Sequence, residues 1–195
     1  MGGSATRVLT GLHDVELAAL AAAGGRREFG ELVRRHGPAV RGLLRRMGAD
    51  PASADDFAQD AFLIAFERMA EFRGEGTFVA WVRRIAARLY LKRRAKDAQT
   101  VLEAEPREPE PVKAYADAGS RVDLDGALKF LSKAERLSVS LCYGAGLSHS
   151  EVAEALNIPL GTVKSHVKRG LDKLRERLAP PTDGLDDGAG SVAHG

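Results

Sequence analysis

Two blocks of basic side chains stand out in a chain whose charges otherwise nearly balance. The net charge is +2 over 195 residues, yet residues 73–96 carry eight Lys or Arg against one acid, and residues 161–178 carry six against two. Guanidinium and ammonium groups at this density bind a polyanion such as nucleic acid. Basic faces of amphipathic helices are often merely solvated, but two such blocks favour two separate contacts with a polyanion.

The second basic block lies in a pattern that is typical of a helix-turn-helix. Ser148 and Glu151 have the spacing of a capping box, Ala153 is small enough for a helix crossing, and Asn157 tolerates a left-handed turn. The second helix then directs outward a polar set that suits phosphates and base edges in a major groove. This set is Thr162, Lys164, Ser165, His166, Lys168 and Arg169. The alternative is a plain helical hairpin with one basic face.

An acidic stretch precedes the first basic block. Residues 50–71 carry six acids and a single Arg. Helical spacing places Asp56, Gln59, Asp60 and Leu63 on one face beside aromatic residues, and such a face suits a basic partner helix. The alternative is an ordinary amphipathic helix whose acids are solvated.

The elements that must position these side chains are helices, because apolar spacing is helical nearly throughout and no convincing alternating strand occurs. We expect an all-α fold of two small helical domains joined by a flexible acidic linker, the C-terminal domain being a helix-turn-helix. The linker is rich in Glu and Pro and cannot bury enough apolar surface to offset its ordering entropy. The expected boundaries are an N-terminal extension 1–27, a first domain 28–99, the linker 100–123, a second domain 124–179 and a disordered tail 180–195.

Turn and cap residues predict where individual helices begin and end. In the first domain we expect a helix over 28–47 that is interrupted at Gly37–Pro38, and a helix over 54–72 with Ser53 as N-cap. Thr77 is expected to cap a third helix that ends near Lys96. In the second domain, the expected helices cover 124–130, 133–143, 149–156 and about 161–178.

Several function classes are excluded by what the sequence lacks. Cys142 is the only cysteine, so no intramolecular disulfide can form, and the five histidines have no metal-ligand spacing. No phosphate-binding glycine loop or recognisable nucleophile setting occurs, so we expect no cofactor, no metal and no enzymatic activity. No apolar run approaches the roughly 18 residues of a membrane span. We therefore expect no membrane insertion and a cytoplasmic location, with a short helix near the N-terminus rather than a signal peptide.

The sequence of the second basic block resembles a known family. Residues 156–165 read Leu-Asn-Ile-Pro-Leu-Gly-Thr-Val-Lys-Ser, which is similar to the promoter-binding C-terminal domain of bacterial sigma factors, particularly the extracytoplasmic-function (ECF) group. Only Asn157 differs from the typical phrase. The resemblance implies recognition of the upstream, minus thirty-five promoter element by the outward set of this helix.

Two further segments resemble the N-terminal domain of the same family. Residues 54–66 are similar to the helix that grips the polymerase clamp, which implies a polymerase-binding role for Asp56, Gln59, Asp60 and Leu63. Residues 72–86 are similar to the loop and helix that open the downstream, minus-ten element. The glycines of that loop would let backbone approach an extruded base while the cations hold the strand. The implied set is Arg73, Gly74, Gly76, Arg83, Arg84, Arg88 and Lys92.

Some residues of this segment have other interpretations. Trp81 lies on an apolar stripe and fits a core position better than a stacking platform. Arg88 stands where the family usually has Asn, and Leu91 and Lys92 stand where an acid is usual.

The resemblance implies an alternative sigma factor that binds core RNA polymerase and promoter DNA and directs promoter-specific initiation in a stress or envelope response. It also implies control by an anti-sigma factor. One alternative is a stand-alone helix-turn-helix transcriptional regulator, which would not explain the first basic block beside a glycine loop. Another is a sigma mimic that sequesters an anti-sigma factor, although both basic blocks are retained here.

Overall fold

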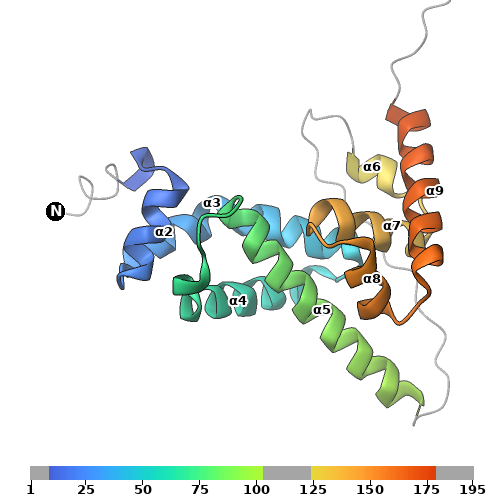
Figure 1. The fold of residues 1–195 in the computed structure, drawn as a ribbon, viewed down its shortest axis with the longest axis horizontal. Coiled ribbons are helices and arrows are strands. Elements are labelled where there is room, and N and C mark those ends of the chain that lie inside the picture. The colour runs from blue at the N-terminus through green and yellow to red at the C-terminus, as the bar shows by residue number, and fades with distance from the viewer. Residues whose placement is uncertain (1–8, 103–123, 179–195) are drawn as a thin grey trace, which may run out of the picture.

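The computed structural model describes residues 9–102 and 124–178, and every regular element in these ranges is helical (Figure 1). The all-α fold class is therefore confirmed. Most of the predicted linker, 103–123, and the predicted tail, 180–195, lie outside the described residues. The first half contains α2 (Asp14–Ala22), α3 (Arg26–Met47), α4 (Pro51–Glu67), the 3-10 turn η1 (Met69–Glu71) and α5 (Phe78–Leu102). The second half contains α6 (Leu124–Leu128), α7 (Lys133–Val139), the π-turn η2 (Ser140–Gly144), α8 (His149–Leu156) and α9 (Leu160–Leu178).

Helix α3 runs through Pro38 without a break, so the predicted interruption at Gly37–Pro38 is wrong. A proline inside a helix removes one backbone hydrogen bond and costs about 3 kcal/mol. However, Leu32 lies before the proline and Leu43 and Leu44 lie after it, and all three are almost completely buried in the same core. Burying each leucine contributes about 1.5–3 kcal/mol, so tertiary packing outweighs the local cost.

Helix α4 begins at Pro51 rather than at Ala54, because its N-cap is Asp50 and not Ser53. The carboxylate of Asp50 accepts a hydrogen bond from the backbone N–H of Ser53 at 3.0 Å. Pro51 occupies the first helical position, where its missing N–H would have had no partner in any case. The helix also ends at Glu67, and the separate turn η1 takes up the remainder of the predicted span.

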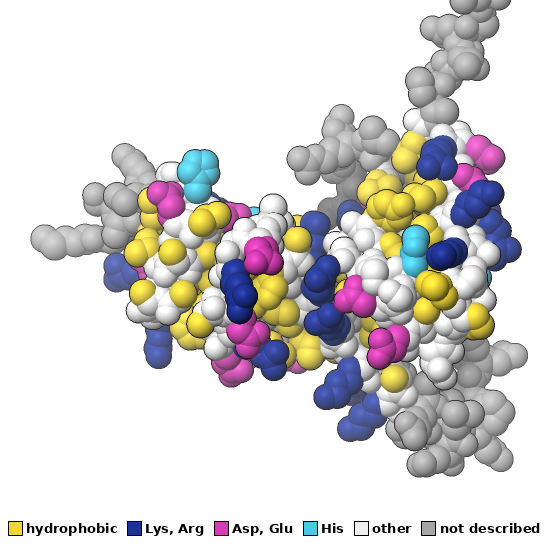
Figure 2. Space-filling model, viewed as in Figure 1, with side chains coloured by type: hydrophobic (Ala, Val, Ile, Leu, Met, Phe, Trp, Pro, Cys, Tyr) yellow, Lys and Arg dark blue, Asp and Glu magenta, His cyan; other side chains and the backbone are white. Residues whose placement is uncertain are grey.

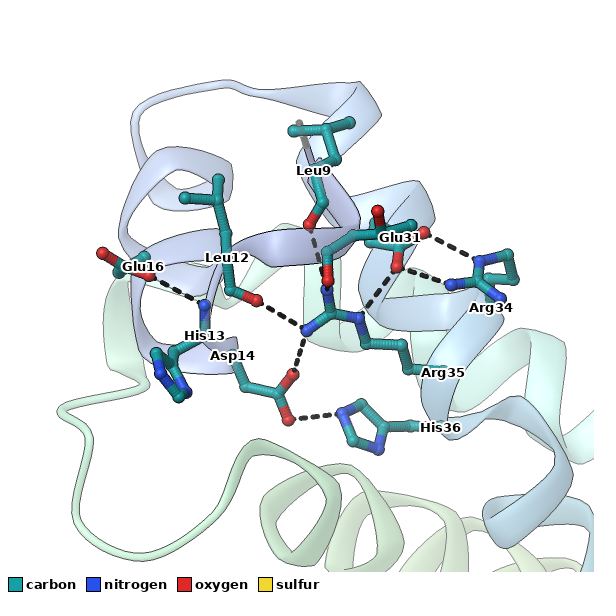
Figure 3. A network of polar contacts seen from close by, with 10 residues as sticks. Leu9, Leu12, His13, Asp14, Glu16, Glu31, Arg34, Arg35 and His36 are labelled. Carbon is teal, nitrogen blue, oxygen red and sulfur yellow. Dashed lines mark hydrogen bonds and ion pairs between the residues drawn. The ribbon is translucent and has the colours of Figure 1, made fainter. Parts of the chain in front are cut away.

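Residues 9–22 are held against α3 by buried apolar side chains and by a network of hydrogen bonds and ion pairs (Figure 3). Leu17 is fully buried. The guanidinium of Arg35 donates to the carbonyl oxygens of Leu9 and Leu12 at 2.9 and 2.8 Å, and it pairs with Asp14 at 3.0 Å. Arg35 also bonds Glu31 at 2.8 Å, and together with Arg34 it lowers the pKa of that carboxyl from 4.5 to about 2.

The two halves pack against one another and share one continuous core. Leu43 and Val82 of the first half belong to the same buried cluster as Leu141 and Val152 of the second half. Figure 1 shows the C-terminal end of α3 and the middle of α5 lying against α7 and α8, which agrees with the residue contacts between these elements. A smaller cluster of buried apolar residues lies between α6, α7 and α9. It contains Ala127, Leu128, Leu131, Val139 and Leu174.

Candidate DNA and polymerase interfaces

The helix-turn-helix is built by local hydrogen bonds at both ends of α8. The hydroxyl of Ser148 accepts from the N–H of Glu151 at 3.2 Å, and the Glu151 carboxylate accepts from the N–H of Ser148 at 2.8 Å. This is the predicted capping box. At the other end, Asn157 has φ of 51°, which is the predicted left-handed turn residue. Val152 and Val163 are then buried between the two helices, which fixes the direction of α9.

Helix α9 carries all six residues that were predicted to contact upstream DNA, and four of them are exposed. Lys164, Ser165, Lys168 and Arg169 are exposed, whereas Thr162 and His166 are half-buried. Arg169 lies along its own helix, where it donates to the carbonyl of Ser165 and bonds Nδ1 of His166, each at 3.3 Å. In the part of the chain that the structure describes, neither Lys164 nor Lys168 has an ion-pair partner. These cations are therefore available to a phosphate backbone.

The position of α9 is set by close packing on α7. A Cβ atom at Gly170 would lie 2.8 Å from Cγ2 of Val139, so the absence of a side chain lets the two helices approach. Beside this crossing, Nζ of Lys173 lies 2.8 Å from the buried carboxylate of Glu135. This bond from Lys173 is the main reason why the pKa of Glu135 is lowered. Helix α9 is thus held by both packing and charge.

The predicted downstream face begins at an exposed loop before α5. Gly74 and Gly76 have φ of 75° and 85°, a backbone conformation that glycine adopts without strain. Thr77 caps α5 as predicted, accepting from the N–H of Ala80 at 3.3 Å. Trp81 is half-buried and packs against Phe72 with ring centroids 5.4 Å apart, so it is part of the aromatic core under the loop.

Along α5, Arg84, Arg88 and Lys92 form an exposed stripe at intervals of one helical turn. Two of these side chains reach the second half of the molecule. Arg84 donates to the carbonyl oxygen of Gly146 at 2.5 Å, and Arg88 pairs with Glu151 at 3.2 Å. The remaining predicted contact on this helix is Arg83, whose Nε is buried and has no hydrogen-bond partner among the described residues. Burial is the main cause of its lowered pKa.

The four residues of the predicted polymerase face all lie on α4. Asp56, Gln59 and Asp60 are exposed, and Leu63 has 63% of its surface exposed. The three polar residues line a groove of about 500 Å³ between α4 and the C-terminal part of α5. The far wall of this groove carries Tyr90, Arg93, Arg94 and Asp97, and Arg93 is paired with Asp97. The acidic face is therefore bordered by charged residues of α5, and helical spacing within α4 could not reveal them because they belong to another helix.

The contacts between the halves are also absent from the sequence prediction. Figure 2 shows Lys and Arg side chains over the middle of the molecule, where α5 meets α8, with Asp and Glu side chains directly beside them. Neither Gly146 nor Glu151 carried a predicted role toward α5. The acceptor on Gly146 is a backbone carbonyl, which has no signature in a sequence.

Other kinds of site have little support in residues 9–102 and 124–178. No group of three or more His, Cys, Asp or Glu side chains is arranged to hold a metal ion there. Cys142 is half-buried, and burial raises the pKa of its thiol. No helix in the described ranges is both long enough and apolar enough to cross a membrane.

Comparisons with known proteins place both halves of the chain in the same family. Residues 32–100 match the model of sigma-70 region 2, and residues 127–176 match that of sigma-70 region 4. ECF RNA polymerase sigma factor SigE of Mycolicibacterium smegmatis is 34% identical over 76% of this chain and 61% of that relative. ECF RNA polymerase sigma factor SigM of Mycobacterium tuberculosis is 32% identical over 89% of this chain and 88% of that relative.

A solved structure agrees with these relatives. The sigma factor RpoE from Bartonella quintana, in complex with the anti-sigma factor NepR, has a TM-score of 0.55 and 26% identity, and the match covers 78% of this chain and 97% of that chain. The region 2 match accounts for the first half, so the alternative of a stand-alone helix-turn-helix regulator is not supported. The chain belongs to the sigma-70 family of RNA polymerase sigma factors, in its extracytoplasmic-function group.

Proposed function

We propose that this sigma factor binds core RNA polymerase through the α4 face and divides promoter contact between α9 and α5. In this proposal α9 binds the upstream duplex element, and the loop at 73–77 with α5 holds the separated strand of the downstream element. The observation that carries the proposal is the exposed outer side of α9, with Lys164, Lys168 and Arg169 on a helix of the width that fits a major groove.

The chemistry of the α5 face supports a different task from that of α9. A glycine loop with left-handed φ values lies directly before a stripe of cations, and a core of aromatic rings lies under it. Cations that track one backbone, with open access for an unstacked base, suit single-stranded DNA better than a duplex groove. The exposed Asp60 and Leu63 of α4 offer a mixed acidic and apolar surface to a basic helix of the polymerase.

The proposal extends to the setting in which the protein works. Sigma factors are transcription initiation factors rather than enzymes, and we propose that this chain acts by binding alone, without catalysis or a cofactor, in the cytoplasm. The relative from Bartonella quintana is bound to an anti-sigma factor, and we propose that a partner of this class holds the present chain inactive until a stress or envelope signal arrives.

Run-off transcription tests the proposed function. Purified chain and core polymerase should together give discrete transcripts from a pool of genomic promoter fragments, whereas each component alone should give none. Electrophoretic mobility shift on the same fragments provides a second measurement. Sequence-specific shifts with the chain alone, unchanged by core polymerase and without transcripts, would contradict the proposal and favour a stand-alone regulator.

A further inference from the structure

Helix α9 holds the side chain of one of its arginines in a fixed direction. Nε of Arg169 donates to the backbone carbonyl oxygen of Ser165, and Nη2 donates to Nδ1 of His166, each at 3.3 Å. The two acceptors come from residues four and three positions earlier in the helix, so both bonds lie along one face of α9. Arg169 is thus oriented by its own helix in the free chain.

The atoms in these two bonds decide which edge of the guanidinium group stays free. Nε and Nη2 of Arg169 share one edge of the planar group, and this edge is turned toward the helix. A guanidinium group has five N–H donors, so the edge formed by Nη1 and Nη2 still has one donor on each nitrogen. Two donors in this arrangement match the O6 and N7 acceptors that guanine presents in the major groove.

The same contact fixes the chemical state of the imidazole of His166. A guanidinium group only donates hydrogen bonds, so Nδ1 of His166 must accept and carries no proton. The ring is therefore neutral in this arrangement, and its one N–H proton is on Nε2. His166 is half-buried, whereas Arg169 is exposed. The imidazole thus acts on the surface of α9 as an acceptor for the arginine, and it adds no positive charge there.

Two lysines of the same helix lack such restraints. Lys164 and Lys168 are exposed and form no hydrogen bond or ion pair within the described residues. A lysine ammonium is a point charge on a flexible stem, which suits a phosphate, whereas a fixed planar fork suits the edge of a base. A side chain that is already ordered also loses less conformational freedom on binding. Arg169 and the two lysines are therefore suited to different contacts with DNA.

We propose that His166 is a positioning residue for base recognition: it holds Arg169 so that the Nη1–Nη2 edge meets a guanine, and it thereby sets a preference for G·C at one base pair of the upstream duplex. This inference rests on the proposed function, in which α9 binds that duplex. His166 acts through Arg169 and needs an acceptor at the place of Nδ1. Its effect should therefore fall on the discrimination between base pairs rather than on affinity for DNA in general.

Base-pair substitutions in a promoter duplex identify the position that Arg169 contacts. A promoter identified by run-off transcription supplies the duplex, and each base pair of its upstream element is replaced in turn. Mobility-shift titration with polymerase holoenzyme then gives the preference at each position. Arg169→Lys keeps the positive charge but has no planar fork, so it should lower the preference for G·C at one position by about ten-fold. A preference for any other pair at that position would overturn the inference.

Two variants of His166 then test its role at the same base pair. His166→Phe keeps a flat ring but has no acceptor, and it should lower the preference at the Arg169 position by about three- to ten-fold. His166→Asn is the matched control, because its amide oxygen is joined to Cγ as Nδ1 is and can accept from Arg169; it should keep most of the preference. Both variants should bind a duplex with a scrambled upstream element as wild type does, and thermal unfolding confirms that both are folded.

A double variant and the pattern of losses separate failure of the inference from failure of the proposed function. In the Arg169→Lys background, His166→Phe should have no further effect on the preference, because the arginine through which His166 acts is gone. If His166→Phe keeps the full preference, lowers it only at a different base pair, or lowers it no more than His166→Asn does, the inference is overturned alone. If neither Arg169→Lys nor Arg169→Ala changes binding at any upstream base pair, Arg169 does not contact the duplex, and the role of α9 in the proposed function falls together with the inference.

Discussion

The basic blocks on α5 and α9 have similar compositions but different surroundings. On α9, Lys164 and Lys168 are exposed, and among the described residues Arg169 forms hydrogen bonds only within its own helix. On α5, Arg84 and Arg88 contact the other half of the chain. Charge density in a sequence therefore indicates where a polyanion could bind, but the tertiary structure decides which cations are available before the partner arrives.

The largest expected effect is on binding of core polymerase through the α4 face. In the proposed function, both DNA faces act in transcription only when the chain is bound to polymerase. Gln59→Arg with Asp60→Arg should nearly abolish core polymerase binding in a pull-down, since like charges placed against a basic partner cost several kcal/mol. The matched control is Ala70→Arg with Glu71→Arg, which makes the same charge change at exposed residues of η1. Equal binding of core polymerase by both double variants would show that this face is not the contact.

The next prediction separates the two DNA faces. Arg169→Ala should weaken binding of polymerase holoenzyme to an upstream-element duplex by about 1–3 kcal/mol if the side chain pairs with a guanine. It should leave binding to single-stranded oligo(dT) largely unchanged. Arg175→Ala, on the same helix and outside the predicted set, serves as the control. A mobility-shift titration that gave equal losses for both variants would mean that α9 contributes only diffuse charge.

A smaller effect is expected where α9 is held against α7. Gly170→Ala should destabilise the second half by roughly 1–3 kcal/mol through overpacking, partly offset by the helix preference of alanine, because the added Cβ would lie 2.8 Å from Val139 and 3.2 Å from Leu131. Gly161→Ala near the start of α9 meets nothing within 4 Å. Thermal unfolding followed by circular dichroism should show a lower midpoint for Gly170→Ala only; a lower midpoint for both would contradict the packing argument.

The smallest effect concerns acid stability, in which the halves should again differ. The pKa of Glu31 is lowered to about 2 by its bonds to Arg34 and Arg35, and the pKa of Glu135 is lowered mainly by Lys173. Lowered carboxyl pKa values stabilise the fold above pH 4.5, and this contribution is lost as the pH falls through the folded-state pKa. Glu135→Gln should therefore flatten the acid dependence of circular dichroism.

The fluorescence of Trp81, the only tryptophan, separates the halves in this titration, because Trp81 lies in the first half. Its acid transition should be unchanged in Glu135→Gln and should still follow the Glu31 network. A shift of the Trp81 transition together with the circular dichroism signal would mean that the two halves unfold as one unit.

Most features specified by neighbouring residues were predicted from the sequence, although the N-cap of α4 is Asp50 rather than Ser53. The capping box at Ser148, the cap at Thr77 and the left-handed Asn157 are all present. Each depends on side chains within three residues of the helix end or on the φ preference of a single residue. The outward set of α9 was predictable for the same reason, since its members follow the helical repeat.

Features that depend on distant residues were not predictable. Pro38 favours a break, and only burial of α3 on both sides of it keeps the helix continuous. The contacts between the halves bring Gly144 against Leu43 and the side chain of Arg84 against the carbonyl oxygen of Gly146. The members of these pairs are 101 and 62 positions apart in the chain. Neither a glycine nor an arginine indicates, in a sequence, which distant residue it will contact.

Run-off transcription on a promoter with a pre-melted bubble tests most directly the claim that α9 binds the duplex and α5 holds the strand. Arg84→Ala/Arg88→Ala is preferable to a change at Arg83, whose Nε is buried. On intact duplex promoter both this variant and Arg169→Ala should transcribe poorly. The bubble should restore transcription by Arg84→Ala/Arg88→Ala and should do little for Arg169→Ala. Equal rescue of both variants, or rescue of neither, would contradict the division of labour between the two faces.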